Sequence, residues 1–219
     1  MPGVARGFHE RVCMIDPCPV TLEGNGVSLE PLQSVHAEAL RAAVDDGKLW
    51  KLWYVATAGL APGREKQYVA AALEGQRAGH MLPWVVRELS TDAIVGSTRY
   101  SHIIREIDRV EIGYTFYAQR WQRTHVNTAC KLLLLTHAFE ALGCKVVGFR
   151  ADNLNLRSQQ AVEALGAKKD GVIRHFEVRS DGSARDSHMY SILASEWPIV
   201  RRRLEQRLRR HGLQSTTIN

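Results

Sequence analysis

Apolar and polar residues alternate most regularly between residues 110 and 117. The polar-facing positions include Glu111, Gly113 and Thr115, and the intervening positions are apolar. The apolar set is Val110, Ile112, Tyr114 and Phe116. A period of two is that of a strand with one buried face, so this segment predicts a strand.

Residues 129–142 show a different pattern, because apolar residues occur on every turn and include four consecutive leucines. Gly143 follows directly. This composition predicts a buried helix that opens beside Thr124, Asn127 or Thr128 and stops at Gly143.

Shorter alternating segments, bounded by turn residues, predict further strands. These segments are 83–89, 93–104, 145–150, 171–179 and 187–193. The pair Asn25-Gly26 lies between two short apolar segments and predicts a hairpin near the start of the fold. The first two strands and the 110–117 strand then form an antiparallel meander.

Two helices precede the meander. Ser34 is the expected cap of a helix that runs to about Val44, and a second helix spans about 65–78 and stops at Gly79. Antiparallel strands followed by a helix-linked strand imply a mixed sheet with helices on both faces. The fold class is therefore α/β, of the mixed α+β kind.

The length of 219 residues and the hydrophobic content of 45% favour one domain with a real core. We predict an extension at 1–18, a domain at 19–197 and a basic helix and tail at 198–219. No stretch approaches the ~18 consecutive apolar residues of a membrane span. The first residues also lack the apolar core of a signal peptide, so we expect a cytoplasmic protein without a membrane partner.

The net charge of +6 comes largely from arginines crowded near the end of the chain. They are Arg201, Arg202, Arg203, Arg207, Arg209 and Arg210. A solvated helical face explains them best, and no aromatic residues interleave with them to stack on bases, so no nucleic acid is expected. A nucleic-acid or acidic-partner patch is the alternative.

The spacing of the four cysteines matches no zinc pattern, and no metal site is predicted. Cys130 and Cys144 are expected to be reduced and buried. Cys13 and Cys18 form a disulfide or bind metal with outside help in the alternative interpretation.

The start of the long helix is a candidate anion site. Its first amides lack helical partners and lie at the positive end of the helix dipole, while Arg120 and Arg123 add charge. Phosphate groups of a carrier molecule fit this chemistry.

These segments resemble the GNAT superfamily of N-acetyltransferases, and within it the branch of the ribosomal-protein acetyltransferases RimJ and RimL. The resemblance rests on the strand Glu111-Ile112-Gly113-Tyr114, on the loop led by Trp121, and on Asn155-Leu156-Arg157-Ser158 followed by Leu165-Gly166-Ala167. It implies a single GNAT-like domain whose mixed, mostly antiparallel sheet is splayed at its centre by a bulge near 114–116. It also implies acetyl-CoA as the cofactor.

The resemblance also assigns site residues. The cofactor contacts it implies are Thr115, Phe116, Tyr117, Trp121, Gln122, Arg123, Thr124, His125, Val126, Asn127, Thr128, Asn155 and Ser158. Glu111 is the implied base and Ser158 the implied acid at the leaving thiolate. In the alternative interpretation, Glu111 is a strand carboxylate paired with Arg99 or Arg109, and Asn155 and Ser158 only cap a helix.

The implied function is transfer of acetyl from acetyl-CoA to a primary amine, by direct attack in a ternary complex. The acceptor is a protein N-terminus or a small molecule. Thr124 and Val126 stand where the family's loop has small residues, which keeps open a second hypothesis of a catalytically inactive CoA- or peptide-binding module. A homodimer is a further expectation, since both terminal segments offer surface beyond the core fold.

Overall fold

The computed structural model describes residues 14–52 and 54–212. Cys13 lies outside these residues, and with it the alternative in which Cys13 and Cys18 form a disulfide or bind metal. The described strands form one mixed sheet of eight strands in the order β1-β2-β3-β4-β5-β6-β8-β7. The strands are β1 (Leu22–Gly24), β2 (Val27–Pro31), β3 (Met81–Glu88), β4 (Ala93–Ile104), β5 (Arg109–Tyr117), β6 (Val146–Asp152), β7 (Lys168–Val178) and β8 (Ala184–Leu193).

Every adjacent pair of strands is antiparallel except β5 and β6. The turn between β1 and β2 has Asn25 at φ 53° and Gly26 at φ 80°, as the Asn-Gly hairpin signal predicts. This arrangement confirms the predicted mixed, mostly antiparallel sheet.

The sheet parts between β5 and β6. The two strands pair only from Arg109 to Glu111 on β5 and from Val146 to Gly148 on β6. Beyond these residues each strand continues without the other. The predicted bulge is present, because Tyr114 and Thr115 together oppose Thr98 of β4.

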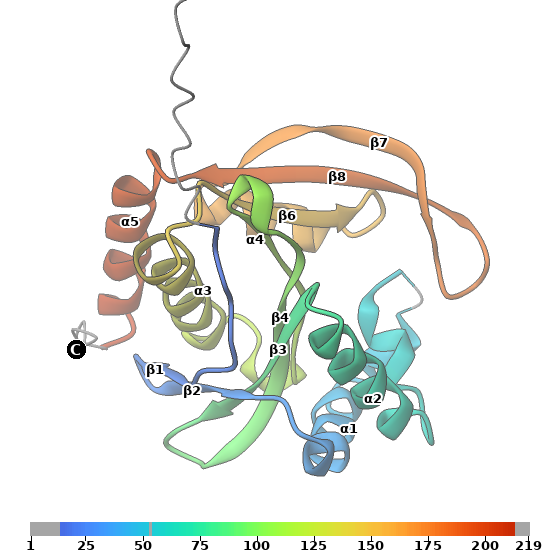
Figure 1. Cartoon of the computed structure of the whole chain (residues 1–219). Coiled ribbons are helices and arrows are strands. Elements are labelled where there is room, and N and C mark those ends of the chain that lie inside the picture. Colours follow the sequence, from blue (N-terminus) through green and yellow to red (C-terminus); the bar gives the residue numbers. More distant parts are fainter. Residues whose placement is uncertain (1–13, 53, 213–219) are drawn as a thin grey trace, which may run out of the picture.

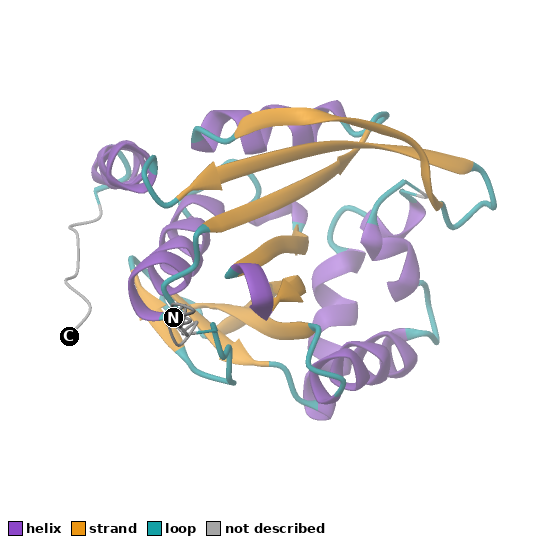
Figure 2. Ribbon diagram, turned by 45° about the horizontal axis from the view of Figure 1, so that its top comes forward, coloured by secondary structure: helices purple, strands orange, loops and turns teal. Residues whose placement is uncertain are grey.

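Helices cover both faces of the sheet (Figure 1). Helices α1 (Ala37–Asp45) and α2 (Glu65–Arg77) pack on one face, and α3 (Val126–Thr136), α4 (Leu156–Leu165) and α5 (Trp197–Arg209) pack on the other. The long β7–β8 hairpin curves past the end of β6, and its far end reaches beyond the rest of the sheet (Figures 1 and 2). The molecule is therefore a three-layered domain with an open seam in its middle layer.

The predicted helix before the meander begins later than expected. Ser34 opens a short 3-10 turn, Ser34–His36, and α1 starts at Ala37. The Gln33 amide donates to Nδ1 of His36 over 3.1 Å, so the turn is held by a histidine rather than by the serine predicted as the cap.

Helix α3 is buried almost all round, as its leucines predict. It continues into a π-helical turn at His137–Ala141 and stops before Gly143, whose φ is 74°. The Tyr100 hydroxyl from β4 donates to the Leu134 carbonyl over 2.5 Å and ties this helix to the sheet. Core packing and this hydrogen bond thus hold α3 in place against the sheet.

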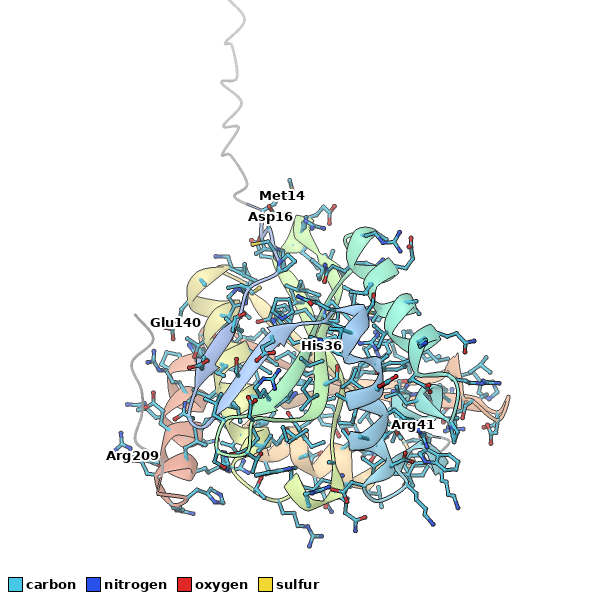
Figure 3. The ribbon with its side chains drawn as sticks, turned by 90° about the horizontal axis from the view of Figure 1, so that it is seen from below. Met14, Asp16, His36, Arg41, Glu140 and Arg209 are labelled. Carbon is cyan, nitrogen blue, oxygen red and sulfur yellow. The ribbon has the colours of Figure 1, made fainter. Side chains whose placement is uncertain are left out.

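Helix α5 belongs to the same core. Its apolar side buries Val200, Leu204 and Leu208, and it packs against α3. On its other side Arg201 pairs with Glu140 at 2.8 Å, and Figure 3 shows Glu140 on the opposite side of the molecule from Arg41 of α1. The predicted boundary at 197/198 therefore falls at the start of a helix that is packed on the domain.

Candidate active site

The loop that precedes α3 lies beside a polar cavity of about 460 Å³. Gln119, Gln122 and Arg123 of the loop line it, together with Arg157 of α4. The opposite side of the cavity is formed by the segment after α1, through Gly47, Leu49 and Leu52. The described lining has two arginines and no carboxylate, so it suits an anion.

The backbone of the loop turns sharply at Arg123, whose φ is 66°. The Thr124 hydroxyl donates to the Trp121 carbonyl over 2.7 Å and accepts from the Val126 amide over 3.3 Å. It is therefore used to fold the loop. The Val126 side chain is fully buried in the core, so it points away from the cavity and does not crowd an anion at the helix start.

The other loop residues divide between the core and the cleft. His125 is the residue before α3, and burial lowers its pKa. Thr128 is buried and Asn127 half-buried. Arg120, predicted to add charge to the anion site, instead bonds Asp46 over 2.7 Å, and this hydrogen bond lowers the pKa of Asp46.

The strand residues assigned to the cofactor present mainly backbone to the seam. The side chains of Phe116 and Tyr117 are 7% and 6% exposed, and Phe116 packs against the α1–α2 layer. The Thr115 hydroxyl lies 2.8 Å from that of Thr98. Because β5 has no partner strand on the β6 side here, its backbone can bond an extended ligand as an added strand would.

Lys131 reaches the same place from α3. Its Nζ atom donates to the Thr115 hydroxyl over 2.9 Å, and the residue is 5% exposed. Burial lowers its pKa to about 8, against the ordinary value of 10.5. The sequence analysis did not single it out, although a lysine among leucines on a buried helix is a visible signal.

Asn155 caps α4, because its Oδ1 atom accepts from the Ser158 amide over 3.1 Å. The turn before it is held by Asp152, which is 2% exposed and bonds Arg179 of the region between β7 and β8 at 2.7 Å. Asn155 therefore caps the helix, as the alternative interpretation expects, and whether it also contacts a cofactor stays a prediction. The cap uses only the oxygen of its side chain, so it does not engage the amide nitrogen.

Glu111 occupies the last position at which β5 and β6 pair. It is 6% exposed and bonds Arg150 at 2.9 Å, with Arg109 at 3.7 Å and the His102 ring at 3.5 Å. The predicted pairing with Arg109 is present, and one with Arg99 is not among the ion pairs of the described residues.

The partner missed by sequence reasoning is Arg150. Its position follows from the strand register, which the sequence alone does not give: Glu111 pairs with Gly148, and Arg150 lies two residues further on the same face of β6. Arg150 also bonds Glu177 of β7 at 2.6 Å, so Glu111 belongs to an ion-pair chain that spans three strands.

The site thus combines a strand that parts from its parallel neighbour with a helix start beside an arginine-lined cavity. The comparisons with known proteins identify the family. A model of the acetyltransferase (GNAT) domain matches residues 27–168, and the chain therefore belongs to the GNAT family of N-acetyltransferases.

Individual relatives agree with this assignment. The chain is 27% identical over 126 residues to the uncharacterized N-acetyltransferase p20 of Bacillus licheniformis, which covers 58% of this chain and 67% of that protein. A GCN5-related N-acetyltransferase from Brucella melitensis is 25% identical with a TM-score of 0.79, covering 88% of this chain and 86% of the other. RimJ of Mycobacterium smegmatis, solved in complex with CoA-disulfide, shares the fold at 21% identity and a TM-score of 0.71, covering 85% and 93%.

In residues 14–52 and 54–212, no helix has the length and apolar character needed to cross a membrane. The same residues contain no group of three or more histidine, cysteine, aspartate or glutamate side chains arranged to hold a metal ion. Cys130 and Cys144 are free and buried, and burial raises the pKa of each thiol to about 12.

Proposed function

We propose that this protein transfers an acetyl group from acetyl-CoA to a primary amine, by direct attack in a ternary complex. The observation that carries the proposal is the seam between β5 and β6, which opens after Glu111 and has an arginine-lined cavity and the start of α3 at one end. Acetyl-CoA, when bound, supplies the acetyl group as a thioester.

The residues present fit such a ligand. Arg123 and Arg157 and the first amides of α3 would hold the phosphates, because they are the uncompensated positive groups of this end of the site. The remaining loop positions, from Trp121 to Thr128, would shape the loop around them. The backbone of Thr115, Phe116 and Tyr117 would bond the pantetheine arm along the free edge of β5.

On the other side of the seam, Asn155 would bond the arm through its amide group while its oxygen caps α4. Ser158 is half-buried one turn into the same helix. We infer that its hydroxyl donates a proton toward the leaving thiolate.

Glu111 is the inferred base. Its carboxylate lies at the point where the strands part, on the face of the sheet covered by α1 and α2. It would take the proton of the attacking amine directly or through a water molecule. The ion pair with Arg150 holds Oε2 in place, and Arg109 lies 3.7 Å from Oε1, so the acceptor amine would have to reach Oε1 in competition with Arg109.

A specific observation also supports the alternative of a binding module without transfer activity. Both Arg150 and Arg109 lie within 4.0 Å of Glu111, and a carboxylate held by two arginines is less accessible to an acceptor amine. An assay of turnover with acceptor amines distinguishes the acetyltransferase from the binding module, because cofactor binding is expected of both.

The test is an acetyl-transfer assay with acetyl-CoA and a panel of amines, run on the wild type, Glu111→Gln and Glu106→Gln. Glu106 is exposed, so its variant is the matched control. We expect Glu111→Gln to lower turnover by roughly 10²-fold without changing the affinity for acetyl-CoA. Equal turnover in all three proteins would remove Glu111 as the base, and no turnover of any amine despite cofactor binding would favour the inactive module.

A further inference from the structure

Arg99 is a buried cation on the same face of the sheet as Glu111, where the acceptor amine would bind. It lies in the middle of β4 and is 3% exposed. Its guanidinium is stacked between two tyrosine rings, with the Cζ atom 4.6 Å from the ring centre of Tyr68 on α2 and 4.5 Å from that of Tyr114 on β5.

One edge of this guanidinium has no partner. The Nη1 atom contacts the Met81 sulfur at 3.2 Å, whereas Nε and Nη2 are buried without a hydrogen-bond partner among the described residues. The buried Tyr68 hydroxyl lies beside this guanidinium. Burial raises the pKa of Tyr68, while the charge of Arg99 opposes the rise, so the two groups lie within each other's electrostatic reach.

No carboxylate of the described residues lies within the 4.0 Å ion-pair distance of Arg99. By contrast, Arg109 and Arg150 pair with Glu111, and Arg185 pairs with Glu177. A buried charge without a counter-ion is unfavourable, and stacking on two rings offsets only part of the lost hydration.

The chemistry of the free edge selects its ligand. In a guanidinium, the Nε and Nη2 hydrogens point in parallel from the same edge, and this pair matches the two oxygens of a carboxylate. These two unpartnered donors and a fixed positive charge favour an anionic group with planar, two-oxygen geometry.

Arg99 faces the same side of the sheet as Glu111. It pairs across the strands with Gly113, and Ser101 pairs with Glu111, so the two side chains occupy successive positions on one face. Tyr114 lies between this face and solvent. It is 39% exposed and sits in the bulge with φ 52°, and its ring stacks on the Arg99 guanidinium.

We propose that the acceptor amine carries a carboxylate, which Arg99 binds through its Nε and Nη2 atoms while the amine approaches Glu111. This inference rests on the proposed function and defines its substrate class. It also gives Arg99 a role in specificity, because an acceptor without a carboxylate leaves the Nε and Nη2 atoms of Arg99 unpaired.

The experiment compares matched pairs of acceptors that differ only in the acid. The first arm uses ω-amino acids, from glycine to 6-aminohexanoate, against their amides. The second uses short peptides with Glu or Gln beside a free N-terminus, which distinguishes a free amino acid from a protein terminus as the source of the carboxylate. Each pair is assayed for kcat/KM with the wild type, Arg99→Met, Arg99→Lys and the exposed control Arg174→Met.

We expect the wild type and Arg174→Met to prefer the acid by on the order of 10²-fold in at least one pair. Arg99→Met should remove the preference by lowering kcat/KM for the acid alone, and Arg99→Lys should restore it only in part because an ammonium lacks the fork. Turnover of amines with equal kcat/KM for acid and amide in every pair would overturn the inference and leave the proposed function standing.

A binding measurement keeps the inference testable when no amine is acetylated. The same acids and amides are titrated into the wild type and Arg99→Met by calorimetry in the presence of CoA. Binding of an acid but not its amide, lost in Arg99→Met, supports the carboxylate site independently of transfer. Absence of any acid-selective binding overturns it.

Discussion

Replacing Lys131 by Met should stabilise the folded protein near neutral pH. Lys131 is 5% exposed in α3, and its Nζ atom donates a hydrogen bond to the Thr115 hydroxyl. Burial lowers its pKa from 10.5 to about 8. Multiplying this difference by about 1.4 kcal/mol per pH unit gives a destabilisation of about 3 kcal/mol, carried by the charged lysine at pH 7.

The sign of the pH dependence follows from the lowered pKa. Below about pH 8 the lysine is protonated in both the folded and the unfolded chain, so the full destabilisation is present. Between pH 8 and 10.5 the unfolded chain binds more protons, and the free energy of unfolding of the wild type rises with pH. Cys130 remains neutral over this range, because burial raises the pKa of its thiol to about 12.

The advantage of Lys131→Met should therefore fall from about 3 kcal/mol at pH 7 to about 1 kcal/mol at pH 10. Urea unfolding followed by circular dichroism at several pH values measures it, as a difference from the wild type so that other titrating groups cancel. Lys66→Met, at an exposed position of α2, should show no such trend. A difference that stays constant with pH, or a variant less stable than the wild type at pH 7, would refute the reasoning.

Three further predictions concern the site and its support. Gly148→Ala should lower turnover by roughly 10²-fold with little change in cofactor affinity. The reason is that a Cβ atom on residue 148 would lie 2.8 Å from Glu111 Cγ and displace the carboxylate. Steady-state kinetics measures both quantities. Asn155→Asp keeps the α4 cap but loses the amide, so calorimetry should show weaker acetyl-CoA binding than the wild type at unchanged stability, and unchanged affinity would refute the contact. Asp152→Ala removes the buried carboxylate that pairs with Arg179 and should lower the free energy of unfolding by about 3–5 kcal/mol in urea titrations, whereas a loss below about 1 kcal/mol would contradict this role.

Elements that depend on local sequence could be predicted. The alternation from Val110 to Phe116 marked β5, the Asn25-Gly26 pair marked the first hairpin, and Gly143 marked the end of the long helix. Each of these features follows from side-chain period or from backbone freedom at one or two residues. The splay of the sheet followed from the family resemblance and not from any local pattern.

Pairings between distant segments could not be predicted in the same way. Glu111 could be placed on a strand, but its contact with Arg150 depends on the register between β5 and β6. The position of Arg99 between two tyrosines depends on α2 packing against the bulge. Val126 stands where the family has a small residue, yet the direction of its side chain is set by packing in the core and not by the loop.

The central claim is that the loop before α3 and the cavity beside it bind acetyl-CoA, and one titration tests it most directly. Calorimetry of the wild type and an Arg123→Ala/Arg157→Ala variant with acetyl-CoA, with ATP as a phosphate-only control, measures the affinity of this site. The account predicts saturable one-site binding of acetyl-CoA to the wild type, little binding of ATP, and affinity at least about tenfold weaker in the variant. A folded wild type that does not bind acetyl-CoA, or a variant that binds it equally well, would contradict the account.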